Sequence, residues 1–251
     1  MLMSGIRDIL ACFELHDAEG IRRCVNGGQD PKQPYRGLPL VYQLVTMYSR
    51  GDQFRVCMKV MEEFGAVVDD PALQSVLTDD AAALEPLLQE RPELLGMRYS
   101  LPCAFTPLEE VTLLHVATEY GHRDTAGLLV QYGADVNAAA GIDGQSFGGH
   151  TPVFHAVNQH QNVNLPVLDF LLAQGASLEL TVPGLIWGKG FDWETYVPSI
   201  NPISYAMMGL LRQFQRSEHE VYAVVERLMM VRYGIDSQPA NLPNKYLYPR
   251  A

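Results

Sequence analysis

One internal segment constrains the fold more than any other part of the chain. Residues 111–140 have the sequence VTLLHVATEYGHRDTAGLLVQYGADVNAAA, whose apolar positions predict two short amphipathic helices, over 113–120 and 123–132. Gly121 and Gly133 follow these stretches, where a glycine in the left-handed conformation commonly ends a helix. Residues 134–137 predict an extended turn. Two helices this short cannot bury their own apolar faces, so neighbouring pairs must stack on them.

The same segment resembles an ankyrin repeat. That family's pattern is T-P-L-H-x-A, then G-H, then L-L-x-x-G-A-D-V-N, and here only Leu113 replaces the usual proline. The resemblance implies structural roles for Thr112, His115, Gly121, Gly133, Asp135 and Asn137. It further implies that His115 forms hydrogen bonds between neighbouring loops.

Looser copies of this unit lie on both sides. Gly65 and Gly133 each close a unit and are 68 residues apart (133 − 65), which is two repeats of about 34 residues. Further motif residues are Thr151, Pro152, Gly175, Pro202 and Gly234. We therefore expect one domain over 1–251, an all-α ankyrin-repeat solenoid of about six stacked helix-turn-helix units with inter-repeat hairpin loops. The expected units are 4–36, 37–70, 71–100, 111–140, 149–180 and 201–236, with a tail at 237–251.

The later units also resemble a group of bacterial ankyrin proteins with a W-G-x-G and W-E loop before a P-I-S-Y-A helix. The matching residues are Trp187, Gly188, Gly190, Trp193, Glu194 and residues 202–206. This second resemblance covers about 100 residues and implies no known activity.

Charge and composition exclude several classes of function. The net charge is −11 and the isoelectric point is near 5.0, which argues against binding nucleic acid or anionic lipid. Residues 1–10 lack the pattern of a secretory signal, and no apolar run approaches the roughly 18 residues of a membrane span. Because no secretory signal is found and no C-x-x-C pair joins Cys12, Cys24, Cys57 and Cys103, we expect reduced thiols in a cytoplasmic protein. We also expect a monomer.

Three motifs suggest chemistry, but their surroundings argue against it. Residues 144–148 spell G-x-S-x-G around Ser146, yet no buried strand is predicted before them. The central histidines include His155 and His160, whose spacing does not place them on one helical face, so no metal site is expected. Residues 184–190 lack the length and the Ser or Thr of a phosphate loop. We expect no catalytic residue and no cofactor.

Two insertions between repeats, residues 138–148 and 181–200, form the candidate recognition surface. Insertions in a repeat array fall on loops of one face, often the binding face, and the second insertion carries both tryptophans. The candidate partner-binding residues are Trp187, Phe191, Trp193, Tyr196, Phe147 and His150. Alternatively, Trp187 and Phe191 cover the groove between the last two repeats. Acidic pairs such as Glu109-Glu110 indicate either a solvated face or attraction of a basic partner.

Ankyrin arrays mostly bind proteins, so we expect a non-catalytic module that binds another protein. Small-molecule or carbohydrate binding at residues 182–200 is the alternative, and a hydrolase is a third. A pocket beside Trp193 would favour a small ligand, whereas a broad exposed apolar patch would favour a protein.

Overall fold

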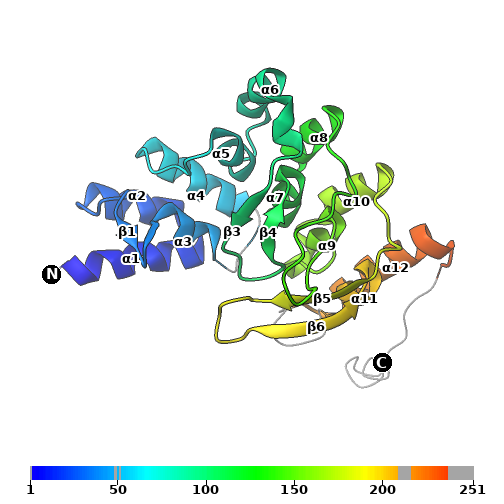
Figure 1. The fold of residues 1–251 in the computed structure, drawn as a ribbon. Helices are drawn as coiled ribbons and strands as arrows, with labels where there is room; N and C mark the ends of the chain where they lie inside the picture. The colour runs from blue at the N-terminus through cyan, green and yellow to red at the C-terminus, as the bar shows by residue number, and fades with distance from the viewer. Residues whose placement is uncertain (1, 48–49, 51, 209–215, 237–251) are drawn as a thin grey trace, which may run out of the picture.

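The computed structural model describes residues 2–47, 50, 52–208 and 216–236 (Figure 1). The α-helices are α1 (Leu2–Leu15), α2 (Ala18–Asn26), α3 (Val41–Val45), α4 (Asp52–Glu63), α5 (Pro71–Leu77), α6 (Ala81–Glu90), α7 (Leu113–Glu119), α8 (Arg123–Gln131), α9 (Pro152–Ala156), α10 (Leu165–Ala173), α11 (Pro202–Met207) and α12 (Glu218–Tyr233). Two short 3₁₀ helices are η1 (Pro92–Leu95) and η2 (His160–Asn162). The strands are β1 (Pro34–Tyr35), β2 (Leu38–Pro39), β3 (Tyr99–Leu101), β4 (Leu108–Val111), β5 (Val182–Trp187) and β6 (Thr195–Ile200).

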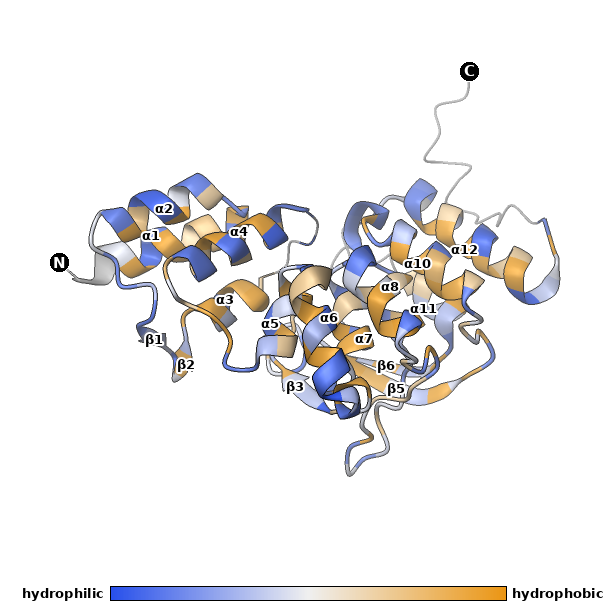
Figure 2. Cartoon of the chain, turned by 90° about the horizontal axis from the view of Figure 1, so that it is seen from above, coloured by the Kyte–Doolittle hydropathy of each residue, from blue (hydrophilic) through white to orange (hydrophobic). Residues whose placement is uncertain are grey.

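The α-helices contact one another in consecutive pairs, from α1 with α2 to α11 with α12. The first helices of the pairs pack on one another in two rows: α1 on α3, and α5 on α7, α7 on α9 and α9 on α11. The second helices pack in the same way, α2 on α4, and α6 on α8 and α8 on α10. In both views α1–α4 lie at one end of the molecule and α10–α12 at the other (Figures 1 and 2). The helices α7 and α8 agree with the two predicted over 113–120 and 123–132.

Local side-chain chemistry explains where the degenerate pair α5–α6 begins and turns. Asp70 accepts a hydrogen bond from the Leu73 amide at 2.8 Å, and Asp80 accepts one from the Ala83 amide at 2.9 Å. Each carboxylate caps the amino end of its helix. Asp79 has φ 52°, so it makes the left-handed turn that glycine makes in better-matched pairs.

The expected all-α architecture is wrong, because the connections between helix pairs form β-structure. β1 pairs with β2, β3 with β4 and β5 with β6, all antiparallel, in three separate two-stranded sheets. The pairs are also unequal: α3 and α9 are five residues long, whereas α12 has sixteen. The prediction treated these connections as loops, but β-branched and aromatic residues favour strands. The chain is therefore not an all-α array of about six similar units.

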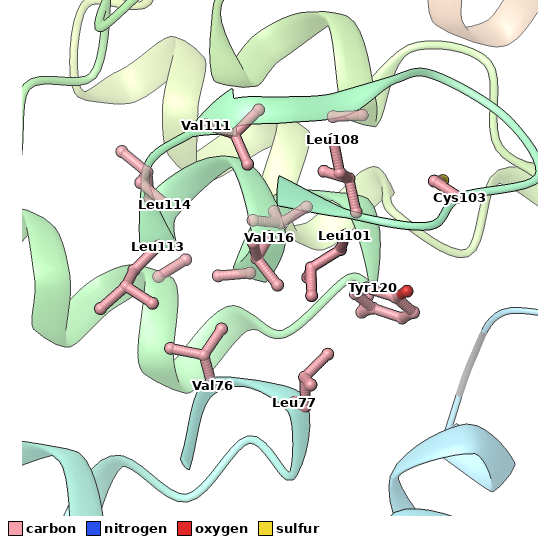
Figure 3. Close-up of a cluster of buried hydrophobic side chains, with 14 of the residues drawn as sticks. Val76, Leu77, Leu101, Cys103, Leu108, Val111, Leu113, Leu114, Val116 and Tyr120 are labelled. Carbon is pink, nitrogen blue, oxygen red and sulfur yellow. The ribbon is translucent and has the colours of Figure 1, made fainter. Parts of the chain in front are cut away.

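One part of the continuous core lies where the β3–β4 hairpin covers the helices. Leu101, Leu108 and Val111 point from the hairpin toward α7, and Val76 and Leu77 approach from α5 (Figure 3). Val116 and Tyr120 of the α7 segment are at most 1% exposed among them. Burial of these side chains from both kinds of element ties the hairpin to the helix rows.

A second contact joins helix pairs that are not consecutive, and we call it the α4–α7 joint. The Phe54 ring of α4 stacks on Tyr120 with centroids 4.5 Å apart, and the Tyr120 hydroxyl donates to the Val45 carbonyl oxygen at 2.8 Å. Arg50 forms an ion pair with Glu119 at 3.3 Å, with both side chains fully buried. The pair α5–α6 lies between these elements in the sequence.

One expectation concerns residues that the structure does not describe. The predicted tail at 237–251 lies outside the described residues. Within the described residues, no helix is both long and apolar enough to cross a membrane.

Candidate partner-binding face

The second insertion is a β-hairpin rather than an irregular loop. Val182 pairs with Ile200 and Trp187 with Thr195 at the two ends of the β5–β6 register. At Gly184, an added Cβ would lie 2.6 Å from Cε2 of Tyr196, so glycine allows the Tyr196 ring to lie across β5. Pro198 and the left-handed Ser199 (φ 46°) interrupt the outer strand, which disfavours the addition of another strand there.

The two insertions lie against each other and against the β3–β4 hairpin. The Gly148 amide donates to the Gly184 carbonyl oxygen at 3.0 Å, and the Gly188 amide donates to the Phe105 carbonyl oxygen at 3.1 Å. The Phe147 and Tyr196 rings are 4.7 Å apart at an angle of 41°. We call the surface made by residues 98–111, 138–150 and 182–200 the hairpin face.

Two large apolar side chains on this face are exposed to solvent. Ile142 is 67% exposed and Tyr196 is 50% exposed, while Phe147 is partly buried against Tyr196. Ile142 and Phe147 belong to the same loop, which is closed by a bridge between Ile142 and Gly148. We call Phe147 and Tyr196, whose rings are in contact, the exposed patch.

The other candidate aromatic residues occupy different environments. Trp187 is only 2% exposed and packs against Phe105, with centroids 5.8 Å apart. Trp187 therefore holds the two hairpins together and offers little surface to a partner. Phe191 and Trp193 stack at 4.6 Å near the hairpin tip, both partly buried.

His150 is buried beneath the face. Its Nε2 contacts the Pro107 carbonyl oxygen at 3.0 Å, and since a carbonyl only accepts, Nε2 carries the proton. Nδ1 is then an acceptor, and it has no hydrogen-bond partner among the described residues. Burial lowers the pKa of His150 to about 3, so the ring is neutral near pH 7.

A small cavity opens where the three segments meet. Its volume is about 20 Å³, room for one water-sized group. Its lining comprises Pro107, Glu109, Gly141, Asp143, Phe147, Gly148, His150, Leu185, Ile186 and Lys189. The Lys189 ammonium bonds to the Glu109 carboxylate at 2.7 Å, and this bond raises the lysine pKa.

A buried polar network behind the face was missed by the sequence analysis. Glu119 contacts Arg50 on one side and the His155 Nδ1 on the other, at 3.3 Å and 2.8 Å. A carboxylate at the end of the apolar face of residues 113–120 was a sequence signal for a buried ion pair, but its partner is 69 residues away.

The repeat-motif residues link consecutive helix pairs. His115 Nε2 contacts the His150 carbonyl oxygen at 3.2 Å, and Asn137 accepts from the Ser177 amide at 2.7 Å. Asp135 accepts from the Asn137 amide. Thr151 occupies the N-cap position of α9 without a side-chain cap bond, and Pro152 begins that helix. Pro202 begins α11, and positive φ angles occur at Gly121, Gly133, Gly175 and Gly234.

The remaining motif residues have no geometry of a catalytic or metal site. Ser146 lies at φ 69° in the loop closed by Ile142 and Gly148, whereas a nucleophile elbow joins a strand directly to a helix. Among the residues that the structure describes, no three His, Cys, Asp or Glu side chains are grouped to hold a metal ion.

Comparison with known proteins gives one finding. No curated protein matches the chain. Residues 109–140 match the family model of the ankyrin repeat, a range that contains β4, α7 and α8 almost completely. The match supports an ankyrin-repeat family and places the repeat beside the hairpin face.

Proposed function

We propose that this protein is a non-catalytic module that binds another protein through the hairpin face. The ankyrin repeat at 109–140 is consistent with a protein-interaction module. The observation that carries the proposal is the Phe147–Tyr196 pair, which is formed by two separate insertions and in which Tyr196 is 50% exposed and Phe147 is partly buried. Large aromatic residues bury much surface at small entropic loss, which is why they dominate binding energy at protein interfaces.

The shape of the face favours a protein over a small ligand. The cavity beside Phe147 has about 20 Å³, whereas pockets for cofactors or drug-sized ligands have roughly 300–1,000 Å³. A sugar ring would not enter it. Phe147 lines the cavity and its ring contacts Tyr196, so one protein surface could cover the cavity and the exposed patch together.

The test compares two tyrosines that are similarly exposed at different places. Tyr196 on the hairpin face is 50% exposed, and Tyr233 on α12 is 55% exposed. A protein captured by the full chain from lysate of the source cell would be identified, purified and titrated by calorimetry. We expect Tyr196→Ser to weaken binding at least about tenfold, as for a residue at the centre of an interface. Tyr233→Ser should leave the affinity unchanged.

Circular dichroism must first show that both variants fold. Equal affinities of the wild type and the folded Tyr196→Ser variant would refute binding at this face.

A further inference from the structure

The charged groups around the exposed patch are mostly acidic. The three segments of the hairpin face contain five carboxylates, at Glu109, Glu110, Asp143, Asp192 and Glu194, and two cations, at Arg98 and Lys189. Both cations are engaged: Lys189 bonds Glu109, and Arg98 bonds the Glu110 and Ala139 carbonyl oxygens. The face therefore offers negative charge to an approaching molecule.

Two acidic residues, Glu109 and Asp143, are among those that line the cavity beside the patch. His150 also lines it; its side chain is buried, and its Nδ1 has no hydrogen-bond partner among the described residues. The cationic side chain in the lining is the chain's own Lys189, already bonded to Glu109. An acidic lining of this size suits an ammonium group, which is about as large as the water that the cavity could hold.

We propose that the partner segment bound by the hairpin face is basic, with a large apolar side chain against Phe147 and Tyr196 and a lysine ammonium at the cavity. The partner's ammonium replaces Lys189 as the neighbour of Glu109. This inference rests on the proposed function, since it names the chemistry of the partner for the same face.

The probe is a displayed library of random twelve-residue peptides, selected on the immobilised full-length chain at low salt. We expect the selected peptides to combine a net positive charge with a large apolar residue. Selected peptides that are neutral or acidic would overturn the inference, and they would leave protein binding at this face intact.

Variants of the chain then test the site with the best selected peptide. Asp143→Asn, Asp192→Asn and Glu194→Gln remove three charges and keep the acceptor oxygens that bind the Gln145 and Gly190 amides. We expect this triple variant to bind roughly tenfold more weakly, from three exposed pairs of modest strength. The matched control removes three exposed carboxylates elsewhere, through Glu62→Gln, Glu90→Gln and Asp124→Asn. An equal loss in both triple variants would mean that only net charge matters, and would overturn the site.

For Lys189→Met we expect stronger, not weaker, binding of the peptide. Removing the chain's own ammonium frees Glu109, so the affinity for a lysine peptide should rise a few-fold. An unchanged or lower affinity would exclude the exchange of ammonium groups.

The outcomes also separate this inference from the proposed function. If Tyr196→Ser abolishes binding of the protein partner while the acidic triple variant binds it normally, the face binds a protein but the inference of a basic partner is refuted. If Tyr196→Ser has no effect on binding of the protein partner, the proposed function itself is refuted.

Discussion

The protein joins its helix pairs in two different ways. Between α7 and α9, neighbouring pairs pack directly, and His115 and Asn164 bond to backbone carbonyl oxygens across the contact, Asn164 to Thr118 at 2.6 Å. The α4–α7 joint connects pairs separated by α5–α6 and contains a fully buried ion pair. The Arg50 guanidinium also lies over the Tyr120 ring, 4.6 Å from its centroid.

The comparison shows which interactions the α4–α7 joint contains in addition to the stacking of helix pairs. Consecutive pairs present matching apolar faces, so burial of those faces stabilises the contact in proportion to area. The α4–α7 joint adds an aromatic stack and a buried ion pair to such packing. Charges removed from water are stable only while each keeps its partner.

The largest expected effect comes from removing the ion pair of the α4–α7 joint. Glu119→Ala leaves Arg50 buried without its carboxylate, and loss of one partner of a buried pair costs about 3–5 kcal/mol. Urea denaturation followed by circular dichroism measures the loss. We expect the double variant Arg50→Met/Glu119→Leu to recover only part of the loss, because both charges are then gone but the buried His155 Nδ1 still lacks the carboxylate that it bonds. A double variant that is less stable than Glu119→Ala would contradict this account.

A second prediction breaks the contact between the α7–α8 and α9–α10 pairs. Gly121 has φ 72°, and an added Cβ would lie 2.6 Å from Asn164 Oδ1. Gly133 has φ 97° with open space around it, so an alanine there adds backbone strain without a steric contact and serves as the control. We expect Gly133→Ala to cost about 1 kcal/mol and Gly121→Ala roughly 1–3 kcal/mol more, from crowding. Equal losses in thermal or urea unfolding would show that Asn164 moves aside freely.

Acid should weaken both kinds of contact. Burial lowers the pKa of His122, beside the α4–α7 joint, to about 4 and that of His150, whose carbonyl His115 contacts, to about 3. Above about pH 6.5 both the folded and the unfolded chain carry these rings neutral. Below that pH the unfolded chain binds protons that the folded chain does not, so stability falls until the folded pKa is reached. We expect about 2 kcal/mol lost per histidine between pH 6.5 and 5.

Urea midpoints at pH 7 and 5 measure this loss, and His122→Asn should reduce the slope with pH. A stability that is constant over this range would refute neutral burial of these rings.

The sequence could predict the stacked contact but not the other joint. Residues 111–140 contain a nearly complete repeat pattern, so α7 and α8 followed from local spacing, and the link from His115 was implied by the resemblance to an ankyrin repeat. Arg50 and Glu119 are 69 residues apart, and no local pattern relates them. Glycine and proline occur within residues 182–200, and such residues are typical of loops, so local propensity does not predict the strands β5 and β6. Phe147 and Tyr196 were named as candidates, but only the hairpin register places their rings together.

The smallest expected effect tests whether a hydrogen bond lost in the α4–α7 joint acts differently from one lost elsewhere in the core. Tyr120→Phe removes the hydroxyl that donates to the Val45 carbonyl oxygen, and Tyr205→Phe removes one that bonds the Thr106 hydroxyl at 2.8 Å. Both tyrosines are at most 1% exposed, so each change should cost about 1 kcal/mol. Native-state hydrogen exchange distinguishes them. Because only Tyr120 belongs to the α4–α7 joint, Tyr120→Phe should speed exchange in α1–α4 more than in α7–α10, whereas Tyr205→Phe should not. If both variants change α1–α4 alike, these helices do not open separately, and the α4–α7 joint is as cooperative as the stacked contact.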